Sequence, residues 1–306
     1  MIYDVIIIGS GPAGLSAAIY AQRAELKNIV IEKTGFSGGQ IINTYEVDNY
    51  PGTPGISGFD LSAKFREHCD KLNTTFVTGE VVELKLEDDI KLLTLDDGSQ
   101  YKAKTIVIAS GGLPRHLNVP GEDKFSGLGL SYCATCDGAF FKNRKVAVVG
   151  GGDVAVEDAI FLSRICEKVY VIHRRDEFRA IKSSVNKLLE NENVTILWDS
   201  VVESINGTET VESLDVKNVK TGESSKIDVD GVFIAVGYIP TSQIYKDIVA
   251  TDDSGYIIAG ENTETNVPGI FAAGDIRTKD LRQIITAASD GANAITAVER
   301  YLNKIN

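Results

Sequence analysis

The segment Val5-Ile6-Ile7-Ile8-Gly9-Ser10-Gly11-Pro12-Ala13-Gly14 predicts a strand, a tight turn and the start of a helix. Its apolar run is typical of a strand that is buried on both faces of a parallel sheet. A second apolar strand, 29–31, ends on Glu32. In this context the glycines let a pyrophosphate approach the helix N-terminus, and the carboxylate accepts hydrogen bonds from a ribose. The segment therefore predicts a dinucleotide-binding α/β fold, with a glycine-rich turn of no function as the alternative.

The same pattern recurs in the second half of the chain. The strand 146–149 runs into Gly150-Gly151-Gly152-Asp153-Val154-Ala155, and His173 lies as far from Gly150 as Glu32 does from Gly9. Arg174 and Arg175 follow directly, and Arg179 follows one helical turn later. A carboxylate here would repel a 2′-phosphate, whereas an arginine fork pairs with one. We therefore predict NADP(H) at this second turn, with a solvated basic cluster as the alternative.

A pair of cysteines lies between the two turns, in Cys133-Ala134-Thr135-Cys136-Asp137-Gly138. Such a pair can close into a disulfide and carry two electrons. In isolation, half of a zinc site or a structural disulfide would explain the spacing equally well. Its position between two nucleotide-binding turns favours a redox role.

The remaining cysteines, Cys69 and Cys166, are single and fall in or near helical patterns, which predicts buried thiols. No second pair is available for a Cys₄ zinc site, and the histidines at 68, 116 and 173 are scattered. We predict no metal site.

The composition is that of a globular protein large enough for two domains. The chain has 306 residues, of which 43% are hydrophobic and 24% charged, and its net charge is −12. Nucleic acids and anionic membranes select basic surfaces, so neither is an expected partner. No apolar run reaches membrane-spanning length and no signal peptide precedes the first strand, so we expect a cytoplasmic location.

Three further regions complete the expected domains. Residues 76–107 are typical of short antiparallel strands with a turn at 96–98, and a buried strand follows at 105–109. Residues 194–236 repeat this style, with turns at 206–207 and 221–222. Near the end, a strand at 269–273 leads to Gly274-Asp275 and then to a helix over about 282–301. An acid at that point suits ribityl hydroxyls and flavin oxygens, although a helix N-cap alone would also explain Asp275.

With these motifs in place, the chain resembles the bacterial-type, low-molecular-weight thioredoxin reductases, within the FAD/NADPH flavoprotein disulfide reductases, nearly end to end. The larger glutathione-reductase type carries its dithiol just after the first fingerprint, whereas residues 35–45 here contain no cysteine. The motifs that carry the resemblance are 9–14, Gly39-Gln40 with Asn49, 133–137, 150–155, 173–179, and 269–275 with Arg282-Gln283.

The resemblance implies an α/β fold of two Rossmann-like, three-layer ββα domains. An FAD-binding domain would comprise 1–114 and 241–306, with an NADPH-binding domain, 115–240, inserted and carrying the dithiol. For FAD it implies Gly9, Gly11, Pro12, Ala13, Gly14, Glu32, Lys33, Gly39, Gln40, Asn49, Gly111, Gly274, Asp275, Arg282, Gln283 and Ile284. For NADPH it implies Gly150, Gly152, Asp153, Val154, Ala155, His173, Arg174, Arg175, Arg179 and Gly237.

The implied activity is that of an NADPH-dependent thioredoxin-disulfide reductase. Hydride would pass from NADPH to FAD, and the electrons would then reduce the Cys133–Cys136 disulfide, which exchanges with thioredoxin or a thioredoxin-like protein. By the family pattern Cys136 lies nearer the flavin and Cys133 attacks the partner. Asp137 fits a protonated acid that protonates the leaving thiolate, with a surface acid of no function as the alternative. The family also implies a homodimer.

Domain motion follows from this arrangement. The dithiol and the nicotinamide must each reach one flavin held in the other domain, and the dithiol must also meet a protein partner. We therefore expect rotation about hinges near Pro114-Arg115 and 237–240.

Two positions depart from the family pattern. Ser110 stands where threonine is commoner and keeps the hydroxyl, whereas Val154 stands where a hydroxyl usually faces the NADPH phosphates. Losing one hydrogen bond to a charged group costs roughly 1.5–3 kcal/mol, which the arginines could largely offset. Two rival functions follow: a ferredoxin-dependent flavin thioredoxin reductase, and a flavin redox sensor without turnover.

Overall fold

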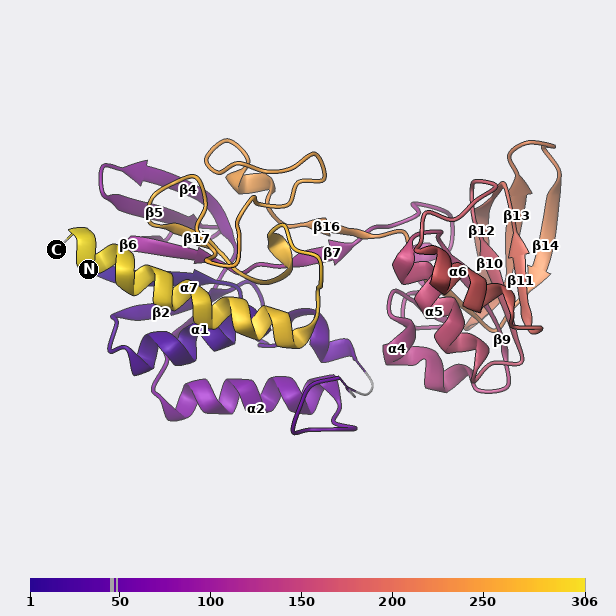
Figure 1. Cartoon of the computed structure of the whole chain (residues 1–306), viewed down its shortest axis with the longest axis horizontal. Helices are drawn as coiled ribbons and strands as arrows, with labels where there is room; N and C mark the ends of the chain where they lie inside the picture. Colours follow the sequence, from indigo (N-terminus) through magenta and orange to yellow (C-terminus); the bar gives the residue numbers. More distant parts are fainter. Residues whose placement is uncertain (45–46, 48, 306) are drawn as a thin grey trace. The chain divides into compact units, whose positions relative to one another are not determined.

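The computed structural model describes residues 1–44, 47 and 49–305, with the side chains of Asn43 and Cys136 outside the description. The chain forms two compact units. Unit 1 comprises Met1–Leu113 and Ile239–Asn306, and unit 2 comprises Pro114–Tyr238. Each unit is an α/β structure built on a sheet with parallel strands, which confirms the predicted fold class (Figure 1). Which nucleotide each unit binds remains a prediction.

The sheet of unit 1 has seven strands in the order β3-β2-β1-β6-β5-β4, with β17 also paired to β6. The pairs of β1, β2, β3, β6 and β17 are parallel, whereas β4, β5 and β6 form an antiparallel meander. The strands are β1 (Ile2–Ile8), β2 (Asn28–Glu32), β3 (Phe76–Thr78), β4 (Val81–Glu87), β5 (Ile90–Leu95), β6 (Gln100–Ile108) and β17 (Ile270–Ala272).

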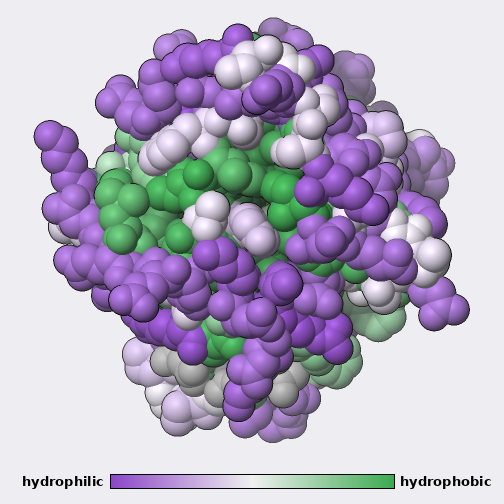
Figure 2. Space-filling view, turned by 90° about the vertical axis from the view of Figure 1, so that its right-hand side faces the viewer, coloured by the Kyte–Doolittle hydropathy of each residue, from purple (hydrophilic) through white to green (hydrophobic). Residues whose placement is uncertain are grey.

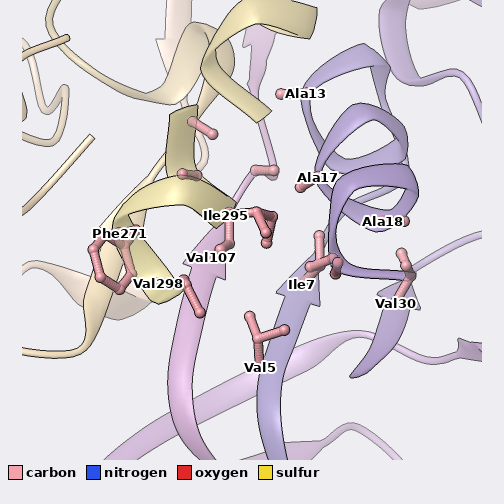
Figure 3. Packing of buried hydrophobic residues seen from close by; sticks show 14 of the residues in the cluster. Val5, Ile7, Ala13, Ala17, Ala18, Val30, Val107, Phe271, Ile295 and Val298 are labelled. Carbon is pink, nitrogen blue, oxygen red and sulfur yellow. The ribbon is translucent and has the colours of Figure 1, made fainter. Parts of the chain in front are cut away.

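One face of this sheet is covered by helices α1 (Pro12–Arg23), α2 (Gly58–Lys71) and α7 (Ile284–Ile305) (Figure 1). Figure 3 shows Val5, Ile7 and Val107 of the sheet packed against Ala17 of α1 and Ile295 of α7. The two helices approach closely because α7 has a glycine at the contact: a Cβ on Gly291 would lie 2.1 Å from the Ala13 carbonyl oxygen. A second core on the other sheet face includes β4, β5 and residues from 245 to 276.

Unit 2 has three layers. Its central sheet has five parallel strands in the order β11-β10-β9-β15-β8, and a three-stranded antiparallel sheet has the order β12-β13-β14. Helices α5 (Asp153–Ser163) and α6 (Lys182–Leu189) pack on one face of the central sheet, and the second sheet packs on the other. The strands are β8 (Leu130–Ser131), β9 (Lys145–Val149), β10 (Lys168–Ile172), β11 (Val194–Leu197), β12 (Ser200–Gly207), β13 (Val211–Asn218), β14 (Ser224–Asp228) and β15 (Gly231–Ile234).

Short elements complete the two units. The chain crosses between the units twice, through β7 (Gly112–Pro114) and β16 (Tyr238–Pro240), and these two strands pair with each other. The remaining elements are α3 (Glu122–Phe125), α4 (Ala134–Asp137), η1 (Gly39–Asn43), η2 (Gly138–Phe141), η3 (Gln243–Tyr245) and η4 (Gly274–Ile276).

Three details of the predicted strands were wrong. β3 and β11 pair in parallel with their neighbours instead of joining antiparallel hairpins, because each lies at the edge of a parallel sheet. The strand predicted over 105–109 is the end of the longer β6, which begins in the antiparallel meander and continues into the parallel core. The turn predicted at Asn206-Gly207 falls at 208–210, since β12 continues through Gly207.

On the face seen in Figure 2, hydrophilic side chains predominate and surround an area where hydrophobic ones gather. Within the described ranges, none of the helices combines the length and the hydropathy needed to cross a bilayer.

Candidate functional site

The first glycine-rich turn joins β1 to α1 in unit 1. A Cβ on Gly14 would lie 1.9 Å from the Gly9 carbonyl oxygen, and Gly9 itself has a φ of 99°. Only glycine permits this conformation without strain and this close approach. Pro12 occupies the first turn of α1, and no side chain caps the helix at Gly11. The first-turn N–H groups of α1 are therefore available to an anion.

Glu32 lies at the end of β2 beside this turn. Its Oε2 accepts hydrogen bonds from the Ser10 backbone N–H at 2.7 Å and the Ser10 hydroxyl at 2.6 Å, and its Oε1 accepts one from the Thr34 N–H at 3.1 Å. These bonds fix the carboxylate in place. Ser10 occupies both acceptor sites of Oε2, so Oε1 is the oxygen that can accept a further donor. The neighbouring Lys33 pairs with Glu80 at 2.8 Å.

Further residues of the predicted FAD set converge on the same turn. A Cβ on Gly39, in η1, would lie 3.3 Å from the Cα of Gly11. The Gln40 side-chain amide donates to the Gly112 carbonyl at 3.1 Å, next to Gly111. Asn49 donates to the Gln283 side chain at 2.8 Å, although the two are far apart in sequence. The structure thus places η1 against the start of α1, joins Gln40 to the segment that contains Gly111, and joins Asn49 to Gln283.

Asp275 lies in η4, directly after β17. Its Oδ1 atom is buried and accepts no hydrogen bond from any described residue. Burial raises the pKa of this carboxyl, against the opposing charges of Lys279 and Arg282. The N-cap alternative for Asp275 is wrong, because α7 begins only at Ile284. A buried acceptor without a donor is a position where a bound hydroxyl would fit.

A buried ionic network holds η4 against α7. Asp290 accepts hydrogen bonds from the Gly274 N–H at 2.8 Å, from Arg277 at 2.7 and 2.8 Å, and from Lys279 at 2.9 Å. Burial acts to raise the pKa of Asp290, but the hydrogen bonds and charges of Arg277 and Lys279 outweigh it and lower the pKa. Arg282, from the predicted FAD set, stacks its guanidinium over the Tyr256 ring at 4.0 Å.

The second turn, in unit 2, repeats the first. It joins β9 to α5, whose N-cap residue Gly152 carries no side-chain cap. A Cβ on Gly152 would meet no atom within 4 Å, and the same holds for Gly237 at the end of the unit. Val154 is 50% exposed and Ala155 is buried. The N-terminus of α5 is thus open, with backbone donors but without a hydroxyl at position 154.

The arginines predicted to bind a 2′-phosphate follow β10. Arg174, Arg175 and Arg179 are exposed, and none of them forms an ion pair within the described part of the chain. His173 differs from them because its ring is buried. Its Nε2 contacts the Glu177 carbonyl at 3.0 Å, and its ring stacks on Phe178 with centroids 5.5 Å apart. Burial lowers the pKa of His173, and the arginine charges add to that effect.

The dithiol lies at the start of α4 in the same unit. Cys133 is disulfide-bonded, its Sγ lies 3.5 Å from the Thr135 hydroxyl, and its N–H donates to Ser131 Oγ at 3.0 Å. The side chain of Cys136 lies outside the described residues. Asp137 is half-buried, and its N–H donates to the Cys133 carbonyl at 3.2 Å.

Cys69 and Cys166 are free, buried thiols, as predicted. Burial raises their thiol pKa to about 12 and about 11. Among the residues with described placement, no cluster of His, Cys, Asp and Glu could hold a metal ion.

Residues 3–291 match the family model of the pyridine nucleotide-disulphide oxidoreductases, and the chain belongs to this family. Members of this family use a flavin together with a pyridine nucleotide. The relatives within the family are more specific. The thioredoxin reductase of Peptoclostridium acidaminophilum is 45% identical over 98% of this chain and 97% of its own length.

Solved structures give the same result. The thioredoxin reductases of Streptococcus pyogenes and Lactococcus lactis are 46% and 42% identical, each with a TM-score of 0.81 over 99% of both chains. A ferredoxin-flavin thioredoxin reductase from Clostridium acetobutylicum is 30% identical, with a TM-score of 0.56 over 100% of this chain and 99% of its own. The resemblance to bacterial thioredoxin reductases is therefore confirmed.

Several residues of these sites were not predicted. Ser10 lies between Gly9 and Gly11, at a position where the glycine motif requires no particular residue type. The Arg277–Asp290 pair joins a loop to a helix, and no sequence motif indicates it. Phe178 and Trp198, which pack beside His173 with centroids 4.6 Å apart, lie on separate elements. Pairing of this kind needs the folded chain.

Proposed function

We propose that the protein is an NADPH-dependent thioredoxin-disulfide reductase, in which unit 1 binds FAD and unit 2 binds NADPH and carries the redox-active dithiol. One observation carries this proposal. Helices α1 and α5 both begin without a side-chain cap. Glu32 ends the strand after α1, whereas three arginines without ion pairs to described residues follow the strand after α5. The Cys133 disulfide lies in the same unit as α5. Thioredoxin as the substrate follows from the curated relatives.

The residues of unit 1 fit FAD. The first turn of α1 offers N–H donors to a diphosphate, and Oε1 of Glu32 offers an acceptor to a ribose. Asp275 Oδ1, buried without a donor, suits a ribityl hydroxyl. Burying an unpaired acceptor costs about 1–3 kcal/mol, which a hydroxyl donor would remove.

The residues of unit 2 fit NADPH. The open N-terminus of α5 suits the diphosphate, and the exposed arginines suit the 2′-phosphate because guanidinium groups pair with phosphate in a bidentate geometry. The hydroxyl that Val154 lacks is compensated by these charges. The ferredoxin-dependent alternative gives no role to the arginines, and the redox-sensor alternative gives none to a dithiol that exchanges with a partner.

When bound, NADPH supplies a hydride and FAD accepts it and delivers two electrons to the disulfide. The reduced Cys133 then attacks the disulfide of thioredoxin as a thiolate and forms a mixed disulfide. The Cys136 thiolate attacks Cys133, releases the partner dithiol and restores the Cys133–Cys136 bond. Asp137, beside the pair, holds the proton for a leaving thiolate. A cytoplasmic location remains a prediction from the sequence, and a homodimer remains a prediction from the resemblance.

The role of Cys133 can be separated from that of the flavin site by measuring the two half-reactions. Cys133→Ser should abolish thioredoxin reduction, by at least a thousandfold, and leave flavin reduction by NADPH within about twofold, because the flavin site lies in the other unit. Cys166→Ser, a buried thiol outside the site, is the matched control and should keep both reactions. Loss of flavin reduction in Cys133→Ser, or retained thioredoxin turnover, would contradict the assignment.

A further inference from the structure

Two hydrogen bonds from backbone N–H groups, one to a side chain and one to a carbonyl, fasten the segment 174–181, here called the basic segment, to the start of α5. Asp153 is the first residue of that helix, and its Oδ1 accepts a hydrogen bond from the Ile181 N–H at 2.7 Å. The Arg179 N–H donates to the Gly151 carbonyl at 2.8 Å. The end of the basic segment is thereby held against the phosphate-binding turn.

The beginning of the basic segment is held from the other side. The buried His173 ring contacts the Glu177 carbonyl and packs between Phe178 and the second turn: a Cβ on Gly151 would lie 2.1 Å from its Cε1 atom. The Asp199 N–H donates to the Arg175 carbonyl at 3.1 Å. The backbone that carries the arginines is therefore fixed at both ends.

The arginine side chains remain uncommitted in spite of acids nearby. Asp176, within the basic segment, pairs with Lys220 at 2.9 Å, and Lys220 also reaches Asp199 at 3.1 Å. Lys220 thus pairs with one acid within the basic segment and with a second, Asp199, whose N–H is bonded to that segment. A cationic group on an already ordered backbone binds a phosphate with a smaller loss of conformational entropy.

The resemblance places Asp153 among the NADPH-binding residues. We propose instead that Asp153 is a positioning residue for coenzyme selectivity, whose carboxylate oxygen holds the basic segment in place for the 2′-phosphate and does not itself bind coenzyme. The inference rests on the proposed binding of NADPH in unit 2. A negative charge beside a diphosphate opposes binding, so we assign the role of Asp153 to the acceptor that it provides for the Ile181 N–H. In this proposal Asp153 acts through its hydrogen-bond acceptor, Oδ1, and its negative charge is not required.

Two variants separate these features, because Asp153→Asn and Asp153→Ala both remove the charge but only the alanine removes the acceptor. We would measure the dissociation constants of NADP⁺ and NAD⁺ with the oxidised, FAD-loaded protein by calorimetry. The NADP⁺ over NAD⁺ preference should be unchanged in Asp153→Asn and roughly three- to tenfold smaller in Asp153→Ala.

A second readout does not depend on coenzyme. Trp198 is the only tryptophan of the chain, and its ring packs against Phe178 of the basic segment. Its acrylamide quenching in the FAD-loaded protein should increase in Asp153→Ala and stay at the wild-type value in Asp153→Asn.

The outcomes distinguish this inference from the function on which it rests. Equal NADP⁺ and NAD⁺ affinity in the wild type would overturn the proposed coenzyme of unit 2. A wild-type preference that both variants keep, with unchanged quenching, would overturn the role of Asp153 alone. A preference lost equally in both variants would assign the effect to charge and also contradict the proposal.

Discussion

At the scale of single residues, the flavin assignment depends most on Asp275. Its buried Oδ1 has no donor among the described residues, and the pKa of the carboxyl is raised chiefly by burial. An acid with a raised folded-state pKa destabilises the folded protein at neutral pH. A site residue of this kind costs stability in the free protein and contributes affinity when its ligand is bound.

Asp275→Ala should therefore have two opposite effects. It should weaken FAD binding about tenfold, because a hydroxyl loses its acceptor, and it should raise the Tm of the flavin-free protein. The gain in Tm should be present near pH 7 and disappear below about pH 4, where the wild-type carboxyl is protonated in both folded and unfolded states.

Flavin retention during gel filtration and thermal scans from pH 3.5 to 7.5 would measure both effects. Asp253→Ala, at an exposed acid of the same unit, is the control and should change neither quantity. Lower stability of flavin-free Asp275→Ala at neutral pH would show that Asp275 is paired in the free protein.

At the scale of elements, the turn that carries Asp275 is positioned by the end of the chain. Asp290 of α7 accepts the Gly274 N–H and also binds Arg277 and Lys279 within a buried network. Removing one partner of a buried ion pair leaves an uncompensated charge. Helix α7 and the turn that carries Asp275 should therefore lose stability together when this network is broken.

Asp290→Asn should destabilise the protein by about 3 kcal/mol at neutral pH. The pKa of Asp290 is lowered in the folded state, so the stability that it contributes is present above its ordinary pKa and is lost as the pH falls through the folded value. The difference in unfolding free energy between wild type and variant should thus shrink below about pH 4. Urea denaturation at several pH values checks this, and a difference that stays constant with pH would refute the ionic account.

Some of these elements could be predicted from the sequence and others could not. The strand–turn–helix units at 5–14 and 146–155 were predicted because buried parallel strands are uniformly apolar and the turns need glycine. The direction of β3 and β11 was missed because a short edge strand carries no pattern that distinguishes parallel from antiparallel pairing. The contacts of Asp290 and Asp153 were missed because each depends on which loop the fold brings to a helix end.

At the scale of the whole molecule, the proposed functional residues are distributed over the two units. The sequence repeats one nucleotide-binding pattern, and the fold repeats it as two compact units joined by the strands β7 and β16. The proposed flavin residues all lie in unit 1, whereas the disulfide and the arginines lie in unit 2. Turnover therefore requires electrons to pass between the units, which is why we expect the rotation inferred from the sequence.

The central claim is that electrons run from NADPH through a flavin to the dithiol and then to thioredoxin. An anaerobic titration of the flavin-loaded protein tests it directly: NADPH or NADH is added while the flavin absorbance is followed, and oxidised thioredoxin is added last. The account predicts that NADPH bleaches the flavin at stoichiometric amounts, that NADH does so poorly, and that thioredoxin restores the colour. A flavin that stays oxidised after NADPH is added would contradict the account and favour a ferredoxin-dependent reductase. Val154, which lacks the hydroxyl that usually faces the NADPH phosphates, would then be a sequence feature consistent with that result.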